Sequence, residues 1–193
     1  MPRTRTFIGV DVGPDIRGRA AALQQSLAAS GADVKWTEPH NLHVTLLFLG
    51  EVDDRELVDI CRLVSVAAGR EPAFPLRVSG VGAFPTPRRP KILWGGITDG
   101  ADNLQRFHAA LEQPLFDLGA YRREERAYTP HLTLGRAKAD EDANALAPLL
   151  PKLLAWDGGR TQVDEVLVYS SDFETGRGRG PTYTVVGRAE LSG

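Results

Sequence analysis

The sequence predicts an α+β fold of two pseudo-symmetric lobes, each an antiparallel sheet with helices on its outer face, around a central groove. The first reason for this prediction is a repeated tetrapeptide: residues 43–46 are His-Val-Thr-Leu, and residues 131–134 are His-Leu-Thr-Leu. The second reason is that residues 7–84 and 92–169 show the same order of strand, helix, connector, His-containing strand, helix and strand. A pattern repeated in this way is typical of two related structural units.

Equal spacing around the two tetrapeptides is the third observation. Phe74 follows His43 by 31 positions, and Val163 follows His131 by 32. Outside the tetrapeptides the halves share little identity, so the pattern repeats but the residues do not. We expect residues 1–193 to form one domain made of two similar lobes.

In the first half, alternating or continuous apolar residues predict strands, and apolar residues at helical spacing predict helices. Pro14 suits a first helical turn, and Asp53 and Asp54 suit a helix cap. The expected strands are 7–12, 34–37, 43–49 and 74–84, with a loop at 38–41, and the expected helices run from 14 to 31 and from 53 to about 64.

The same signals continue through the second half. Pro114 predicts an interruption or kink in its first helix. Residues 85–91 read as a basic, proline-stiffened loop, and 176–180 as a flexible basic loop. The expected strands are 92–97, 131–136, 162–169 and 181–191, and the expected helices are 102–118 and 140–154.

Each tetrapeptide places a histidine and a threonine on one face of its strand. Successive side chains of a strand point to opposite faces, so His43 and Thr45 share one face, as do His131 and Thr133. The alternate aliphatic residues then face the core. Arg136 nominally falls on the opposite face from His131, and a bulge at Gly135 would bring it to the same face.

Two imidazoles facing each other suit a reaction that removes a proton at one end and delivers one at the other. Phosphodiester cleavage has this requirement. The threonine hydroxyls would donate hydrogen bonds to a phosphoryl oxygen between the rings, and Arg136 would stabilise its charge. No metal or other cofactor is needed for this chemistry.

Other interpretations of these residues are less well supported. A single His-x-Thr is more often an ordinary strand surface, but two copies in matching contexts oppose that interpretation. His40 and His43 are close enough to suggest a metal site, yet no carboxylate or cysteine stands at a recognisable ligand spacing. His108 is expected to be a surface or partly packed residue, and Cys61 a core residue.

Aromatic side chains suggest where a base would stack. Trp36, Phe84 and Trp94 are candidates, although core packing is the default for each. Phe84, beside the basic Arg88 and Arg89, is the preferred one for substrate binding.

Composition limits the class of protein. The 193 residues are 42% hydrophobic and 25% charged with a net charge of −2, which is typical of a soluble globular chain and excludes a general polycation. One cysteine allows no internal disulfide and fits a reducing, cytoplasmic setting. No apolar run is long enough to span a membrane, and we expect a monomer.

At these residues the sequence resembles the 2H phosphoesterases, and within them the RNA 2′,3′-cyclic phosphodiesterases, also called 2′–5′ RNA ligases. The likeness covers nearly the whole chain. Besides the tetrapeptides and the trailing Arg136, it includes residues 82–85, 88–94 and 180–183.

The resemblance implies a bilobal fold and metal-independent hydrolysis of a 2′,3′-cyclic phosphate at an RNA end to a 2′-phosphate. By that analogy His43 is the proton donor to the departing 3′-oxygen and His131 is the proton acceptor from water. Thr45, Thr133 and Arg136 would bind the phosphate. The reverse reaction would join RNA ends through a 2′–5′ linkage.

Two alternatives stay open at this point. The same chemistry could act on another substrate, such as a 2′–5′ oligonucleotide or a cyclic ADP-ribose phosphate. The chain could also bind RNA ends or small cyclic nucleotides without catalysis.

Overall fold

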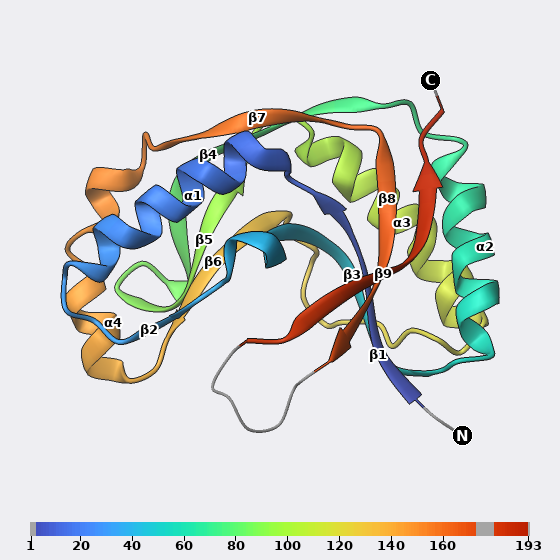
Figure 1. Cartoon of the computed structure of the whole chain (residues 1–193), viewed down its shortest axis with the longest axis horizontal. Coiled ribbons are helices and arrows are strands. Elements are labelled where there is room, and N and C mark those ends of the chain that lie inside the picture. The colour runs from blue at the N-terminus through green and yellow to red at the C-terminus, as the bar shows by residue number, and fades with distance from the viewer. Residues whose placement is uncertain (1–2, 173–179, 193) are drawn as a thin grey trace.

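The computed structural model describes residues 3–172 and 180–192, and the expected loop at 176–179 lies outside them. Its strands form a curled antiparallel sheet in the order β7-β4-β5-β6-β3-β1-β8-β9, with β2 on the edge of β6 (Figure 1). The strands are β1 (Arg3–Asp11), β2 (Val34–Trp36), β3 (His43–Asp53), β4 (Phe74–Thr86), β5 (Arg89–Ile97), β6 (His131–Ala137), β7 (Asp157–Val163), β8 (Glu165–Asp172) and β9 (Thr182–Glu190).

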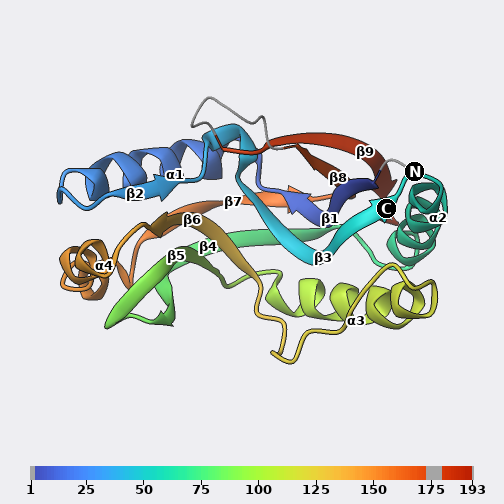
Figure 2. The ribbon, with the colours of Figure 1, turned by 90° about the horizontal axis from the view of Figure 1, so that it is seen from below.

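Four α-helices lie outside this sheet in the described part of the chain. They are α1 (Gly13–Ala28), α2 (Glu56–Ala68), α3 (Ala101–Asp117) and α4 (Asp140–Leu146). Figures 1 and 2 show α1 and α4 at one end of the molecule and α2 and α3 at the other. The predicted α+β class, with antiparallel sheet halves and helices outside, is confirmed.

The sheet divides into two matching halves, which meet at one pairing between β3 and β6, at Val44 and Leu132. One half has the order β3-β1-β8-β9 and the other the order β6-β5-β4-β7. The His-containing strand stands at the inner edge of each half. The two tetrapeptides are therefore neighbours at the centre of the molecule.

Each half of the sheet takes strands from both halves of the sequence. The strand β4 closes the first sequence repeat but pairs with β5 and β7 in the second lobe. The strand β8 closes the second repeat but pairs with β1 in the first lobe. This exchange ties the lobes together by covalent connections as well as by packing.

The helices differ from the prediction in three places. Helix α3 continues through Pro114 to its last residue, Asp117, three residues later, so the predicted interruption is wrong. The predicted helix 140–154 is divided into α4 and a 3-10 turn at Leu150–Leu153, because Pro148 and Pro151 cannot continue an α-helix. Asp53 ends β3 and hydrogen-bonds Arg55, so neither it nor Asp54 caps α2, whose first residue is Glu56.

Among the strands, β7 was not predicted. It begins with Asp157, Gly158 and Gly159, which have low β propensity, and the predicted strand 162–169 spans the end of β7 and most of β8. Residues 85–91 form the end of a hairpin between β4 and β5, so they are not a free loop. The predicted loop at 38–41 contains a 3-10 turn at Pro39–Asn41.

A β-bulge lies at the same place in both His-containing strands. Neighbouring Ile8 and Gly9 of β1 pair with Leu47 and Thr45, so Leu46 is the extra residue. Neighbouring Leu93 and Trp94 of β5 pair with Gly135 and Thr133, so Leu134 is the extra residue. In both strands the bulge shifts the alternation, and the residue three positions after the threonine returns to the face of the histidine.

Candidate active site

His43 is held by two hydrogen bonds at opposite sides of its ring. Its Nδ1 lies 2.7 Å from the carbonyl oxygen of Asn41, and its Nε2 lies 2.8 Å from Oγ1 of Thr45. A carbonyl oxygen only accepts, so Nδ1 carries a proton in both charge states of the ring. Proton gain and loss at His43 are therefore confined to Nε2, beside the Thr45 hydroxyl.

His131 repeats this arrangement in the second lobe. Its Nδ1 lies 2.7 Å from the carbonyl oxygen of Thr129, which is two residues earlier, as Asn41 is in the first lobe. The extended residue before Pro130 presents this carbonyl. The backbone thus fixes the same tautomer on both histidines, with Nε2 as the reactive nitrogen.

The four polar side chains of the tetrapeptides occupy the corners of a small square. Since Val44 pairs with Leu132 in an antiparallel pair, His43 lies opposite Thr133 and Thr45 lies opposite His131. Diagonal positions of such a pair are typically about 7–8 Å apart. That spacing leaves room for a phosphate group between the two imidazoles.

The bulges bring Arg136 and Phe48 to the same face as the square. Arg136 is exposed and lines a cavity together with Thr133. From the sequence we expect a bulge at Gly135 to bring Arg136 to this face, and the bulge lies at the neighbouring Leu134. Phe48 holds the equivalent position in β3 and is 58% exposed. The two lobes therefore offer different chemistry at matching points, a cation in one and an aromatic ring in the other.

Aromatic rings surround both histidines. The His43 ring lies 4.7 Å from Phe7, 5.3 Å from Tyr183 and 5.8 Å from Tyr169, measured between ring centroids. The tyrosines and Phe7 were not predicted as site residues. They come from β1, β8 and β9, and only the crossed topology brings them together.

The rings beside His131 include two that the sequence suggested. Phe84 meets His131 edge to face at 5.2 Å, and Trp94 lies 6.3 Å from it. Phe84 is half-buried, so part of its ring faces the site. Trp36 packs partly against the core, while Tyr128 stacks on His108 at 4.3 Å.

Burial dominates the electrostatics of His43. Loss of hydration lowers the pKa of its imidazole below the ordinary value, and positive charge on His131 lowers it further. The hydrogen bond to Asn41 and the carboxylate of Asp11 oppose these effects without reversing them. His43 is therefore mainly neutral at neutral pH in the free protein, and an anion placed between the rings would favour its protonated form.

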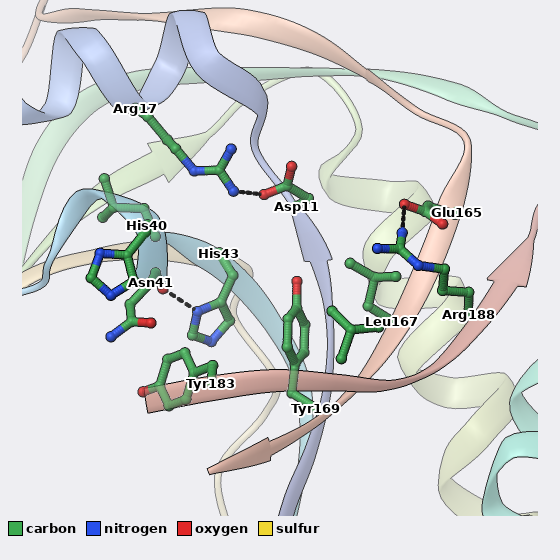
Figure 3. Close-up of a pocket in the computed structure, with 12 residues that line it drawn as sticks. Asp11, Arg17, His40, Asn41, His43, Glu165, Leu167, Tyr169, Tyr183 and Arg188 are labelled. Atoms are coloured by element: carbon green, nitrogen blue, oxygen red, sulfur yellow. Dashed lines mark hydrogen bonds and ion pairs between the residues drawn. The ribbon is translucent and has the colours of Figure 1, made fainter. Parts of the chain in front are cut away.

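Two cavities open beside the square and share Asn41 and Tyr183 as a wall. The first, of about 220 Å³, is lined by His43, His40 and Tyr169 and ends at the ion pairs Asp11–Arg17 and Glu165–Arg188 (Figure 3). The second, of about 330 Å³, is lined by Thr133, Arg136 and Lys35 among others. Each tetrapeptide thus borders a space large enough for part of a nucleotide.

No group of three or more His, Cys, Asp or Glu side chains that could hold a metal occurs in residues 3–172 and 180–192. His40 lies in the first cavity near His43 without such partners. Cys61 is half-buried on α2, against Gly187 of β9. Over the same residues no helix is long and apolar enough to cross a membrane.

Paired imidazoles with tautomers fixed by the backbone, each with a threonine one pleat away, define the class of the two-histidine phosphoesterases. Two such imidazoles are suited to take a proton from one oxygen at a phosphorus atom and to give a proton to another. The remaining aromatic and cationic side chains are suited to bind a nucleotide.

Comparison with known proteins agrees with this class. The family model described as LigT-like phosphoesterase matches residues 10–94. An RNA 2′,3′-cyclic phosphodiesterase of Methanothermobacter thermautotrophicus is 33% identical over 183 residues, 94% of this chain and 96% of the relative. A protein of the same name from Thermotoga maritima is 30% identical over 189 residues, 98% of this chain and 96% of the relative.

Solved structures give the same result. The E. coli LigT complexed with 3′-AMP superimposes with a TM-score of 0.77 at 25% identity over 100% of both chains. The protein TT0787 of Thermus thermophilus gives 0.78 at 26% identity over 98% of both. The chain belongs to the LigT-like phosphoesterase family of the 2H phosphoesterases, and it is a phosphodiesterase.

Proposed function

We propose that this protein hydrolyses 2′,3′-cyclic phosphate ends of RNA to 2′-phosphates, without a metal. The observation that carries the proposal is that both histidines have Nδ1 bound to a carbonyl oxygen, which leaves two Nε2 atoms on one sheet face beside the two threonines. The name shared by the curated relatives supports this substrate.

In the proposed reaction, Nε2 of His131 accepts a proton from the attacking water as its oxygen bonds to phosphorus. The bond between phosphorus and the 3′-oxygen breaks, and Nε2 of His43 donates its proton to that oxygen. The products are a 2′-phosphate and a free 3′-hydroxyl. His131 then releases its proton to solvent and His43 regains one.

Assigning the donor role to His43 rests on family resemblance, and the burial of its ring supplies a physical condition for it. The pKa of His43 is lowered in the free protein, whereas a bound phosphate anion raises it. Substrate binding would therefore draw a proton onto His43 before bond cleavage. The same anion is the group whose leaving oxygen needs that proton.

The non-bridging phosphoryl oxygens would be bound by the hydroxyls of Thr45 and Thr133 and by Arg136. These neutral and charged donors lie on the face that bears both imidazoles, so they supply stabilisation as charge moves onto the oxygens. Phe84, at the edge of His131, would contact the base or ribose.

Ligation would use the same groups in the same roles, with a ribose 5′-hydroxyl in the place of water. His131 would accept the proton of that hydroxyl where water is displaced from the site, His43 would protonate the departing 3′-oxygen, and the product would be a 2′–5′ linkage. We propose hydrolysis as the main activity because the cavities beside the square are open to solvent.

The test is turnover of adenosine 2′,3′-cyclic phosphate by the whole chain and by His43→Ala and His131→Ala. Each substitution is expected to lower kcat by about 10²–10⁴-fold. The midpoint temperature of thermal unfolding should stay close to that of the wild-type protein. The matched control is His108→Phe, which removes an imidazole outside the groove and keeps a ring against Tyr128. Equal turnover in the two variants and the control would refute the two-histidine mechanism.

A further inference from the structure

The strand β2 places a second cation directly beside Arg136. In the pairing of β2 with β6, Lys35 stands opposite Arg136. Residues directly opposite each other in an antiparallel pair point to the same face. Both side chains are exposed, and neither takes part in an ion pair among residues 3–172 and 180–192. The two positive charges therefore lie side by side without compensation in the part of the chain that the structure describes.

Folding does not require this arrangement. Like charges directly opposite each other destabilise a sheet. The equivalent of Arg136 in the first lobe is Phe48, so the position itself does not demand a cation. The connector 118–130, which corresponds to β2 in the second repeat, contains no strand. The cation pair is thus an addition to one lobe of an otherwise matched architecture.

The core side of β2 is packed so that Lys35 stays in this place. Trp36 stands opposite Gly135, where a Cβ atom would come within 2.7 Å of the Trp36 ring. Val34, also on this side, is buried in the core. Glycine at 135 allows β2 to approach β6 closely, and this packing leaves Lys35 on the open face.

The cation pair borders the cavity of about 330 Å³ that also contains Thr133. Glu38 supplies one negative charge to the same lining against the two positive charges of Lys35 and Arg136, so the net charge of the lining is positive. Along β6, Arg136 follows Thr133 by three residues with one bulge, or about 7–10 Å. The long side chain of Arg136 can span that distance, so its guanidinium group can reach the phosphate beside Thr133.

We propose that Lys35 binds the phosphodiester on the 5′ side of the terminal nucleotide, so that the enzyme prefers an RNA strand to a cyclic mononucleotide. The inference rests on the proposed function, in which Arg136 contacts the reacting phosphate. Lys35 stands next to Arg136 on the outer strand, where the adjoining phosphate of a bound strand would arrive. A single-stranded backbone supplies the closely spaced anions that two neighbouring cations match.

The experiment compares adenosine 2′,3′-cyclic phosphate, which has no 5′-phosphodiester, with a trinucleotide ending in a 2′,3′-cyclic phosphate. The whole chain is used in wild-type form and as Lys35→Ala, Lys35→Arg and Lys152→Ala. Lys152 is an exposed lysine of the 3-10 turn Leu150–Leu153, so its substitution removes the same charge outside the cavity.

Lys35→Ala is expected to lower kcat/KM for the trinucleotide about fivefold more than for the mononucleotide at low salt. For the trinucleotide, the slope of log kcat/KM against log salt concentration should be shallower in Lys35→Ala than in the wild-type protein by about 0.7. That is the contribution of one phosphate contact to a single strand. Lys35→Arg should keep the wild-type ratio, and so should Lys152→Ala.

Equal ratios in Lys35→Ala and Lys152→Ala, with normal turnover of the mononucleotide, would overturn the role of Lys35 and leave the proposed function intact. Turnover of neither substrate by the wild-type protein would overturn the proposed function, and the inference with it. The two failures are distinguished by whether the wild-type protein turns over either substrate.

Discussion

The hydroxyl of Tyr128 offers a way to perturb the site without touching a catalytic group. It donates a hydrogen bond of 2.8 Å to the carbonyl oxygen of Thr45, and the ring stacks on His108 with 3° between the planes. Thr45 follows Val44, where β3 pairs with β6, so this hydrogen bond joins the connector before β6 to β3 beside the site. Tyr128→Phe keeps the stacked ring and removes that hydrogen bond.

The magnitude follows from the lost hydrogen bond. A half-buried carbonyl left without its donor costs about 1–2 kcal/mol. In a domain of this size, each kcal/mol lowers Tm by about 2–4 °C, so Tm is expected to fall by about 2–8 °C. The Thr45 hydroxyl also hydrogen-bonds Nε2 of His43, so a shift of Thr45 disturbs the catalytic ring. If the whole ~1–2 kcal/mol is lost from stabilisation of the transition state, kcat falls by about 5–30-fold.

The assay is thermal unfolding together with kcat and KM on a cyclic nucleotide. Tyr121→Phe is the matched control, since Tyr121 is a buried tyrosine of the connector before Tyr128 and is not one of the residues around the tetrapeptides. The control is expected to retain its kcat. If the two variants have the same kcat, Tyr128 does not position Thr45 for the reaction.

Three further predictions concern protonation, packing and metal. As a proton donor with a lowered pKa, His43 must lose its proton, and the enzyme its activity, as pH rises, so the alkaline limb of the kcat/KM profile should lie below pH 6.5. The alkaline limb of the kcat profile should lie at higher pH, because bound phosphate raises the pKa of His43. Coincident limbs in the two profiles would argue against this coupling. Gly135→Ala forces a Cβ against Trp36 and Val34, at an expected cost of about 1–3 kcal/mol in the free energy of unfolding by denaturant, and a wild-type value would show that β2 is not tightly packed. Dialysis against excess chelator should leave kcat unchanged, and its loss with recovery on adding a divalent cation would contradict the metal-free mechanism.

The two tetrapeptides could be located from the sequence because strand periodicity determines which side chains share a face. That rule alone places His43 with Thr45 and His131 with Thr133. It also shows that Arg136 needs a bulge to join them, and the structure has the bulge at Leu134. Local patterns were sufficient because these side chains lie on two adjacent strands.

The aromatic environment of His43 could not be predicted from the sequence. Phe7, Tyr169 and Tyr183 come from three strands that are distant in the chain, and no local pattern indicates that β8 crosses into the first lobe. The strand β7 was missed because Gly158 and Gly159 oppose strand propensity, whereas pairing with β4 overrides it.

The proposed reaction is tested by the product formed from an oligonucleotide that ends in a 2′,3′-cyclic phosphate, incubated with the wild-type chain in excess chelator. The expected product is a 2′-phosphate with a free 3′-hydroxyl, because in the proposed reaction His43 protonates the 3′-oxygen as its bond to phosphorus breaks. A 3′-phosphate would contradict the proposed placement of the leaving oxygen. Absence of any product would contradict the proposed activity itself.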